Sequence, residues 1–270
     1  MTTDRPVAIV TGASSGIGRE TALALARKGY AVVVAARRAD RLAEVASACD
    51  AAGGVGRAVP TNVADRRQVE AMVSAAVSEF GRVDVMVNNA GYGQFARVQE
   101  LDEADLRAIF EVNFFGLFYG CQAVAPIMIG QGSGHIFNVS SIIGRRGTPF
   151  HGAYCATKFA ICGLSDSMRV EMRPHGVRVT TVLPALTETE FFQQSRRGRK
   201  AQSSFQRFKR MMPASAVARQ IVAAIGKNRP ELAISLGGKV LVLLSTLSPR
   251  LVDWMMGRYY ADLSRKLSAE

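Results

Sequence analysis

Cysteine is scarce in this chain, with four residues among 270. None of the four falls in a Cys-x-x-Cys pair or in a Cys/His spacing typical of zinc, so the sequence offers no zinc motif. We therefore expect the cysteines to be small apolar core residues of a protein in a reducing compartment. They are Cys49, Cys121, Cys155 and Cys162.

Targeting and membrane signals are also missing. The first six residues are polar and lead directly into an apolar strand pattern, so they do not resemble a signal peptide. No apolar run reaches the ~20 residues that a membrane-spanning helix needs. The sequence therefore predicts a cytoplasmic protein, and a peripheral membrane contact is the alternative that the C-terminal segment leaves open.

Acidic residues are outnumbered, with 22 against 34 lysines and arginines, for a formal charge of +12. Nucleic acid, an anionic membrane and phosphorylated ligands all suit such a balance. Nucleic acid is disfavoured because the chain contains no recognition module. Seven basic and no acidic residues lie between Phe191 and Met212, within a predicted substrate loop at about 186–212. This segment is either a solvated lid or a contact for an acidic carrier or a phospholipid surface.

Short apolar runs alternate with helical patterns along most of the chain. Runs such as 83–87 show little polar alternation, which is typical of strands buried on both faces. The alternation predicts an α/β fold: a single-domain, doubly wound parallel sheet of Rossmann-like type over residues 1–236. Residues 237–270 are predicted to add a C-terminal helical extension. Strand patterns occur at 7–10, 31–35, 56–59, 83–88, 135–139, 177–183 and 232–234, and helical patterns at 17–28, 40–52, 65–80, 101–129, 154–172 and 214–227.

A glycine-rich turn joins the first predicted strand to the first helix. Its sequence at 11–18 is TGASSGIG, with the spacing G-x-x-x-G-x-G. Glycines allow a tight turn and close approach of the backbone to a pyrophosphate, and the helix N-terminus offers free N–H groups to that anion. The turn therefore predicts a dinucleotide site made by Thr11, Gly12, Ser14, Ser15, Gly16, Ile17 and Gly18.

The end of the second strand predicts which dinucleotide binds. NAD sites place an acidic residue about 20 positions beyond the turn, whereas the segment at 35–38 is Ala-Ala-Arg-Arg and contains no acid. A guanidinium at this place can bind a 2′-phosphate through two hydrogen bonds. Arg37 and Arg38 therefore predict NADP(H), with Arg37 as the principal contact. The alternative is that both are solvated surface residues.

Tyr154 and Lys158 stand one helical turn apart. A free tyrosine has a pKa of ~10, and a cation four residues away is expected to stabilise the phenolate and lower that pKa toward the working range. A hydroxyl is then needed to hold the substrate oxygen. Ser141 lies 13 residues upstream, just after a predicted strand, and this interval favours it over the adjacent Ser140.

Taken in order, these motifs resemble the short-chain dehydrogenase/reductase family over residues 5–235. The turn at 11–18, the Asn-Asn-Ala-Gly segment at 88–91 and the Tyr-x-x-x-Lys pair all match. The resemblance implies a nicotinamide cofactor and a single Rossmann-like domain.

The family's chemistry can be carried over to the matching residues. The resemblance implies that Tyr154 transfers a proton to or from the substrate oxygen and that Ser141 orients that oxygen. Lys158 would lower the pKa of the tyrosine and hold the nicotinamide ribose. Asn113 would hold a water in a proton relay to Lys158.

Two positions depart from the family pattern. Asn62-Val63 replaces the usual Asp-Val beside the adenine, and the amide oxygen can still accept a hydrogen bond from the adenine amine. Pro184-Ala185 replaces the usual Pro-Gly, which requires a negative φ at the alanine. Thr187 or Thr189 would then contact the carboxamide, and the spacing favours Thr189. The cofactor contacts implied by resemblance are Asn62, Val63, Asn89, Ala90, Gly91, Tyr154, Lys158, Pro184, Thr187 and Thr189.

The main hypothesis is an NADP(H)-dependent oxidoreductase that interconverts a carbonyl and an alcohol on an apolar substrate, ketone, steroid-like or retinoid-like. A homo-oligomer, dimer or tetramer, is expected. One alternative is a 3-oxoacyl-carrier reductase, which the long apolar tail disfavours. Another is a non-enzymatic NADP redox sensor, which the Tyr–Lys pair disfavours. The tail is expected to pack on the substrate cleft or a partner subunit, with a membrane interface as the alternative.

Overall fold

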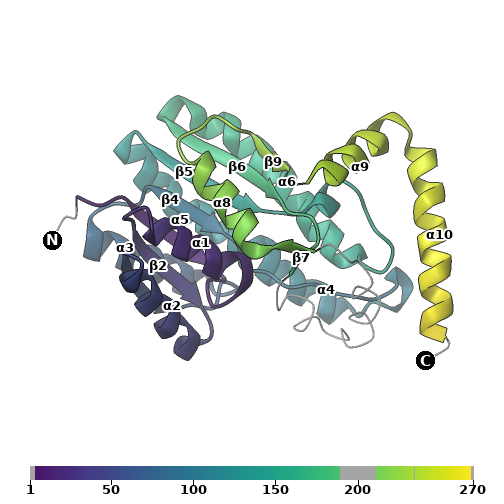
Figure 1. The fold of residues 1–270 in the computed structure, drawn as a ribbon, viewed down its shortest axis with the longest axis horizontal. Coiled ribbons are helices and arrows are strands. Elements are labelled where there is room, and N and C mark those ends of the chain that lie inside the picture. The colour runs from purple at the N-terminus through teal and green to yellow at the C-terminus, as the bar shows by residue number, and fades with distance from the viewer. Residues whose placement is uncertain (1–3, 189–210, 234, 269–270) are drawn as a thin grey trace.

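Seven parallel strands form one sheet in the order β3-β2-β1-β4-β5-β6-β9 (Figure 1). The computed structural model describes residues 4–188, 211–233 and 235–268. The order reverses between β1 and β4, and sheets of this type bind ligands outside the carboxyl ends of the strands at such a point. The predicted doubly wound parallel sheet is confirmed. Its strands are β1 (Val7–Thr11), β2 (Ala31–Ala36), β3 (Val55–Pro60), β4 (Val85–Asn88), β5 (Gly134–Val139), β6 (Val177–Leu183) and β9 (Glu231–Ala233).

Helices cover both faces of the sheet and create two apolar cores. One core joins the sheet to α1 (Gly16–Ala26), α2 (Ala39–Ala51) and α8 (Ala214–Ala224). The other joins it to α3 (Arg66–Phe80), α5 (Gly116–Gln131) and α6 (Gly152–Met172). Alternate residues of β2 enter opposite cores, which explains why the strand sequences lack polar alternation.

The helical pattern at 101–129 corresponds to one helical stretch, Glu103–Gln131, that is not α-helical throughout. The structure has α4 (Glu103–Phe110), a π-helical turn (Glu111–Phe115) and then α5. By length and composition, the stretch 103–131 is long and apolar enough to cross a membrane. This corrects the expectation that no segment of the chain meets that condition. Three α5 residues, Leu117, Val124 and Met128, are buried against the sheet, so the stretch packs here as a core helix.

The predicted C-terminal extension consists of α9 (Leu236–Leu247) and α10 (Pro249–Ser268). Figure 1 shows α9 leaving the sheet near β9 and α10 running along the side of the molecule. Val252 and Leu263 of α10 are fully or almost fully buried, so the extension is partly covered by the body of the protein. An apolar set around the α9–α10 corner nevertheless stays exposed: Val240, Leu243, Leu247, Leu251, Trp254 and Met255.

Smaller features complete the comparison with the sequence. All four cysteines are buried and free, as expected for core residues. Two short strands that the pattern did not predict, β7 (Thr187–Glu188) and β8 (Met212–Pro213), pair with each other. Thr189 and most of the predicted substrate loop, including its basic residues, lie outside the described residues.

Candidate active site

The glycine-rich turn lies at the carboxyl end of β1 and leads into α1. Its backbone has left-handed φ values at Gly12 (66°) and Gly16 (55°), which favour glycine. A Cβ at Gly18 would lie 2.4 Å from the Gly12 carbonyl oxygen, so no side chain fits there. Ser15, the residue before α1, makes no side-chain cap, and the first N–H groups of the helix remain for another acceptor. This cradle suits a pyrophosphate.

The two arginines at the end of β2 lie in different surroundings, one on the glycine-rich turn and one in solvent. Arg38 donates hydrogen bonds to the Ser14 hydroxyl at 2.9 Å and to the Ser15 hydroxyl at 3.1 Å. Arg37 is exposed. Arg38 immediately precedes α2, where the chain turns back toward the glycine-rich loop. The structure therefore places the Arg38 guanidinium on the turn, while Arg37, the predicted principal contact of the 2′-phosphate, points to solvent at the end of the same strand.

Polar contacts join the carboxyl ends of β1 and β4. The Thr11 hydroxyl accepts from the backbone N–H of Asn89 at 3.0 Å and of Ala90 at 3.2 Å. The Asn89 side chain donates to the Thr11 carbonyl at 2.9 Å and to the Gly12 carbonyl at 3.3 Å. The Asn-Ala segment thus holds the turn against the centre of the sheet.

The two residues expected beside the adenine take different positions. Asn62 is partly exposed, and its amide oxygen accepts from the Ala64 N–H at 3.3 Å. Val63 is buried, and a Cβ at Gly116 would come within 2.8 Å of it. Val63 therefore packs against the start of α5, while Asn62 keeps a polar group near the surface.

Ser141, Tyr154 and Lys158 converge where β5 ends and α6 begins. The Tyr154 hydroxyl is hydrogen bonded to the Ser141 side chain. The Lys158 ammonium lies 5.5 Å from the centre of the Tyr154 ring and donates to the Val139 carbonyl at 2.8 Å. Ser140 instead donates to the Lys158 carbonyl at 2.9 Å, so its hydroxyl is used within the core.

The electrostatics of this group differ from the expectation. Burial raises the pKa of Tyr154 above its ordinary value, the neighbouring Cys155 adds to the increase, and the hydrogen bond with Ser141 opposes it. Burial lowers the pKa of Lys158 to about 8. The predicted fall in the tyrosine pKa is therefore wrong for this structure, because desolvation of the phenol dominates and the ammonium is directed at a backbone carbonyl.

Asn113 is fully buried in the middle of the π-helical turn, a feature often found at functional sites. Its amide oxygen accepts from the Tyr92 N–H at 2.9 Å, and its amide nitrogen donates to the Tyr92 carbonyl at 2.9 Å and to the Thr157 hydroxyl at 3.3 Å. A Cβ at Gly91 would lie 3.0 Å from the Asn113 oxygen and 3.8 Å from the Lys158 nitrogen. Asn113 thus ties the 91–92 segment to α6, next to Lys158.

A buried polar network behind the site was not predicted. Asn88 donates to the Asn138 amide oxygen at 3.0 Å, and Asn138 donates to the Ser165 hydroxyl at 3.0 Å. These contacts join β4, β5 and α6. The sequence did contain a signal for this network: Asn88 and Asn138 each stand near the end of an apolar strand, and a buried amide requires hydrogen-bond partners.

The segment after β6 is described up to residue 188. Thr187 is buried, and its hydroxyl donates to the Ala185 carbonyl at 2.8 Å. Ala185 has the negative φ that its replacement of a glycine requires, because Phe150 is the only non-glycine residue with a positive φ in the described part of the chain. Pro184 accepts a hydrogen bond from the Ile142 N–H at 3.2 Å, which places this segment beside Ser141.

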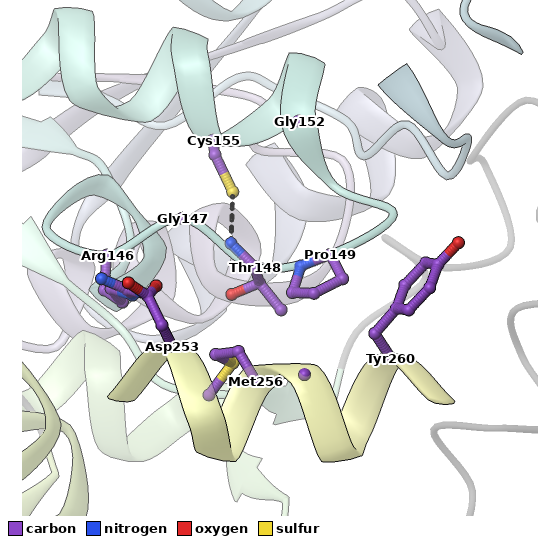
Figure 2. Close-up of a pocket in the computed structure, with 10 residues that line it drawn as sticks. Arg146, Gly147, Thr148, Pro149, Gly152, Cys155, Asp253, Met256 and Tyr260 are labelled. Carbon is purple, nitrogen blue, oxygen red and sulfur yellow. Dashed lines mark hydrogen bonds and ion pairs between the residues drawn. The ribbon is translucent and has the colours of Figure 1, made fainter. Parts of the chain in front are cut away.

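A pocket of about 460 Å³ opens between the loop before α6 and the C-terminal helix α10. Figure 2 shows Asp253, Met256 and Tyr260 projecting from α10 toward this loop, with Cys155 on the opposite wall. Cys155 follows Tyr154 in the first turn of α6, so the pocket lies next to the helix turn that carries Tyr154. In the described ranges no group of three or more His, Cys, Asp or Glu side chains is arranged to hold a metal ion.

Comparison with known proteins identifies the family. Residues 6–200 match the family model described as short chain dehydrogenase. The chain belongs to the short chain dehydrogenase family. It is similar to an uncharacterized oxidoreductase of Bacillus subtilis, 33% identical over 253 residues, which is 93% of this chain and 71% of the relative. A 3β-hydroxysteroid dehydrogenase of Mediterraneibacter gnavus is 36% identical over 71% of this chain and 70% of its own length.

Solved structures of a short chain dehydrogenase/reductase and of an alcohol dehydrogenase show the same fold. One from Burkholderia phymatum in complex with NAD has a TM-score of 0.85 and 30% identity, covering 93% of this chain and 96% of that one. An alcohol dehydrogenase of Thermococcus sibiricus with 5-hydroxy-NADP has a TM-score of 0.75 and 30% identity, covering 85% and 95%. The family membership makes this chain an oxidoreductase that uses a nicotinamide cofactor.

Proposed function

We propose that this chain is an NADP(H)-dependent oxidoreductase that interconverts a carbonyl and an alcohol on an apolar substrate. The observation that carries the proposal is the convergence of Ser141, Tyr154 and Lys158 at the carboxyl edge of the sheet. The glycine-rich cradle lies on the same edge, at the end of β1. A hydroxyl pair for a substrate oxygen and a site for a dinucleotide are thus both available there.

The preference for NADP(H) rests on the basic pair. With no acid at the end of β2, a ribose 2′-hydroxyl lacks the usual acceptor, whereas Arg38 lies on Ser14 and Ser15 at the mouth of the turn. We infer that Arg38 binds the 2′-phosphate from beside the turn and that the exposed Arg37 assists from solvent. Asn62, Val63, Asn89, Ala90 and the segment at 184–189 complete the proposed cofactor contacts.

The nicotinamide supplies or accepts the hydride when it is bound. Tyr154 gives a proton to the substrate oxygen during reduction, and Ser141 holds that oxygen. Because burial raises the pKa of Tyr154, the phenol is protonated at neutral pH and is ready for reduction. Lys158, with a pKa of about 8, carries its charge at neutral pH and loses it in mild alkali. Asn113 positions the 91–92 segment beside Lys158.

Replacing the proposed proton donor tests the assignment. Tyr154→Phe removes one oxygen from the site, so we expect turnover to fall at least about a hundredfold, the lower range for general acid catalysis. NADPH binding should change little, because the hydroxyl is at most one of many cofactor contacts and the glycine-rich cradle is left intact. The assay is NADPH oxidation against a panel of ketones and acyl thioesters, with a separate NADPH titration.

Tyr30→Phe is the matched control, because it removes the same atom from a half-buried tyrosine just before β2, at the amino edge of the sheet and away from the carboxyl edge where Tyr154 lies. It should retain the parent turnover. Turnover by Tyr154→Phe within a few-fold of the parent would contradict the proposed role.

The substrate class is supported by half-buried apolar residues of α9, Leu241 and Val242, which pack against Ile142 beside Ser141 and suit an apolar molecule near the site. Reduction of a 3-oxoacyl carrier is the second candidate. A 3-oxoacyl-[acyl-carrier-protein] reductase of Synechocystis is 37% identical over 68% of this chain and 75% of its own length. We infer a cytoplasmic homo-oligomer in either case, since oligomers are common in this family.

A further inference from the structure

We propose that Tyr260, on the C-terminal helix α10, is a positioning residue for Tyr154 and acts through the ring of Phe150. This inference rests on the proposed function, because it concerns the alignment of the proposed proton donor. Four observations support it: a strained backbone, a stack of three aromatic rings, an ion pair at the other end of the same loop, and a helix start without a side-chain cap.

Phe150 has a φ of 66°, in the left-handed region that a residue with a bulky side chain rarely adopts. Such conformations are strained and persist only where surrounding contacts hold them. Phe150 lies four residues before Tyr154, in the loop that leads into α6. Its carbonyl accepts from the Ala96 N–H at 2.9 Å.

The Phe150 ring lies in a stack between Phe95 and Tyr260. Its centre is 5.0 Å from that of Phe95 and 5.3 Å from that of Tyr260, and both pairs are stacked. Phe95 and Phe150 are buried together with Leu263 of α10. Tyr260 thus stacks on a ring whose backbone is strained and over which the Arg97 guanidinium also lies, 5.7 Å from the ring centre, so the C-terminal helix supplies part of the packing that holds the loop.

A second contact holds the other end of the loop. Arg146 forms an ion pair with Asp253 of α10. Asp253 and Tyr260 lie almost two turns apart on α10, and both face the loop at 146–150, as Figure 2 shows for the labelled side chains. The helix thus spans the loop and contacts it at both ends.

The start of α6 depends on this loop. His151, the residue before the helix, makes no side-chain cap, and the first turn is joined to the loop by the Cys155 N–H to the His151 carbonyl at 2.8 Å and by the Thr148 N–H to the Cys155 Sγ at 3.4 Å. Tyr154 belongs to that first turn. Movement of Phe150 would therefore change the direction of the Tyr154 hydroxyl relative to Ser141.

Two substitutions at one position separate ring packing from the hydroxyl. Tyr260→Leu removes the ring, and we expect kcat to fall about tenfold, since small misplacements of a reacting group reduce rate strongly. The Kd for NADPH should stay within about twofold, because the cofactor cradle is remote from α10. Tyr260→Phe keeps the ring and should restore kcat to within about twofold of the parent.

Met255→Ala on the same helix is the matched control, because Met255 is 41% exposed and Tyr260 39%. It should leave kcat unchanged. A parent-like kcat for Tyr260→Leu, equal losses in the Leu and Phe variants, or a loss that only follows the folded fraction in a thermal melt would each overturn the inference. The proposed function fails separately, if Tyr154→Phe retains turnover.

Discussion

A buried histidine far from the candidate site is expected to make folding sensitive to acid. The Thr180 hydroxyl donates its hydrogen to the Arg229 carbonyl at 2.6 Å, so it must accept from the His135 Nε2–H at 2.8 Å. The His135 Nδ1 then accepts from the Gly226 N–H at 3.2 Å. Both ring nitrogens are occupied in the neutral form. A proton on Nδ1 would place two N–H groups against each other.

The magnitude follows from the displaced pKa. Burial, with a smaller contribution from Arg178, lowers the pKa of His135 to about 3, whereas the unfolded chain has a value of ~6.5. The free energy of unfolding is therefore unaffected by this group at pH values above the unfolded-state pKa. It falls as the pH drops below that pKa, because the unfolded state gains a proton that the folded state does not. It levels off below the folded-state pKa, where both states are protonated. The expected loss is ~2 kcal/mol at pH 5 and ~5 kcal/mol in total.

Urea unfolding at pH 7.5 and pH 5 tests this expectation. His135→Gln does not titrate, so the parent should lose ~2 kcal/mol more than the variant between the two pH values. Burial also lowers the pKa of His151, to about 4, but His151 is present in both proteins and cancels in the comparison. Equal losses in the parent and the variant would refute the reasoning.

Three further expectations concern the cofactor and the tail. Arg38→Ala, at the arginine that lies on Ser14, should reduce the preference of kcat/KM for NADPH over NADH more than Arg37→Ala does, and the reverse order would contradict the proposed contact between Arg38 and the 2′-phosphate. Gly18→Ala should abolish NADPH binding in a titration, because its Cβ would lie 2.4 Å from a backbone oxygen. Leu247→Ser, at a residue 72% exposed, should reduce self-association measured by light scattering, or co-sedimentation with anionic vesicles. Val170→Ser, at a residue 69% exposed on α6, should change neither measurement. Identical behaviour of the two variants would count against the expectation that a partner subunit or a membrane covers the C-terminal helices.

The features that the sequence determined are local ones. Apolar runs without polar alternation predicted strands buried on both faces, and β1, β2 and β6 are such strands. The glycine spacing predicted a turn in which Gly12 and Gly16 adopt left-handed backbone. The four-residue interval between Tyr154 and Lys158 placed both on one helix. Each of these features follows from the backbone geometry of a few consecutive residues, so the local sequence is enough to predict it.

The features that only the tertiary structure decided depend on residues distant in sequence. Spacing marked both arginines after β2, but only the fold shows that Arg38 reaches the Ser14 hydroxyl while Arg37 stays exposed. Four-residue spacing predicted a lowered pKa for Tyr154, but the amount of protein around the phenol raises it. Nothing near Phe150 in sequence predicts that Tyr260 will stack on its ring. Desolvation and packing are sums over neighbours supplied by the whole fold, so they are fixed only when the elements assemble.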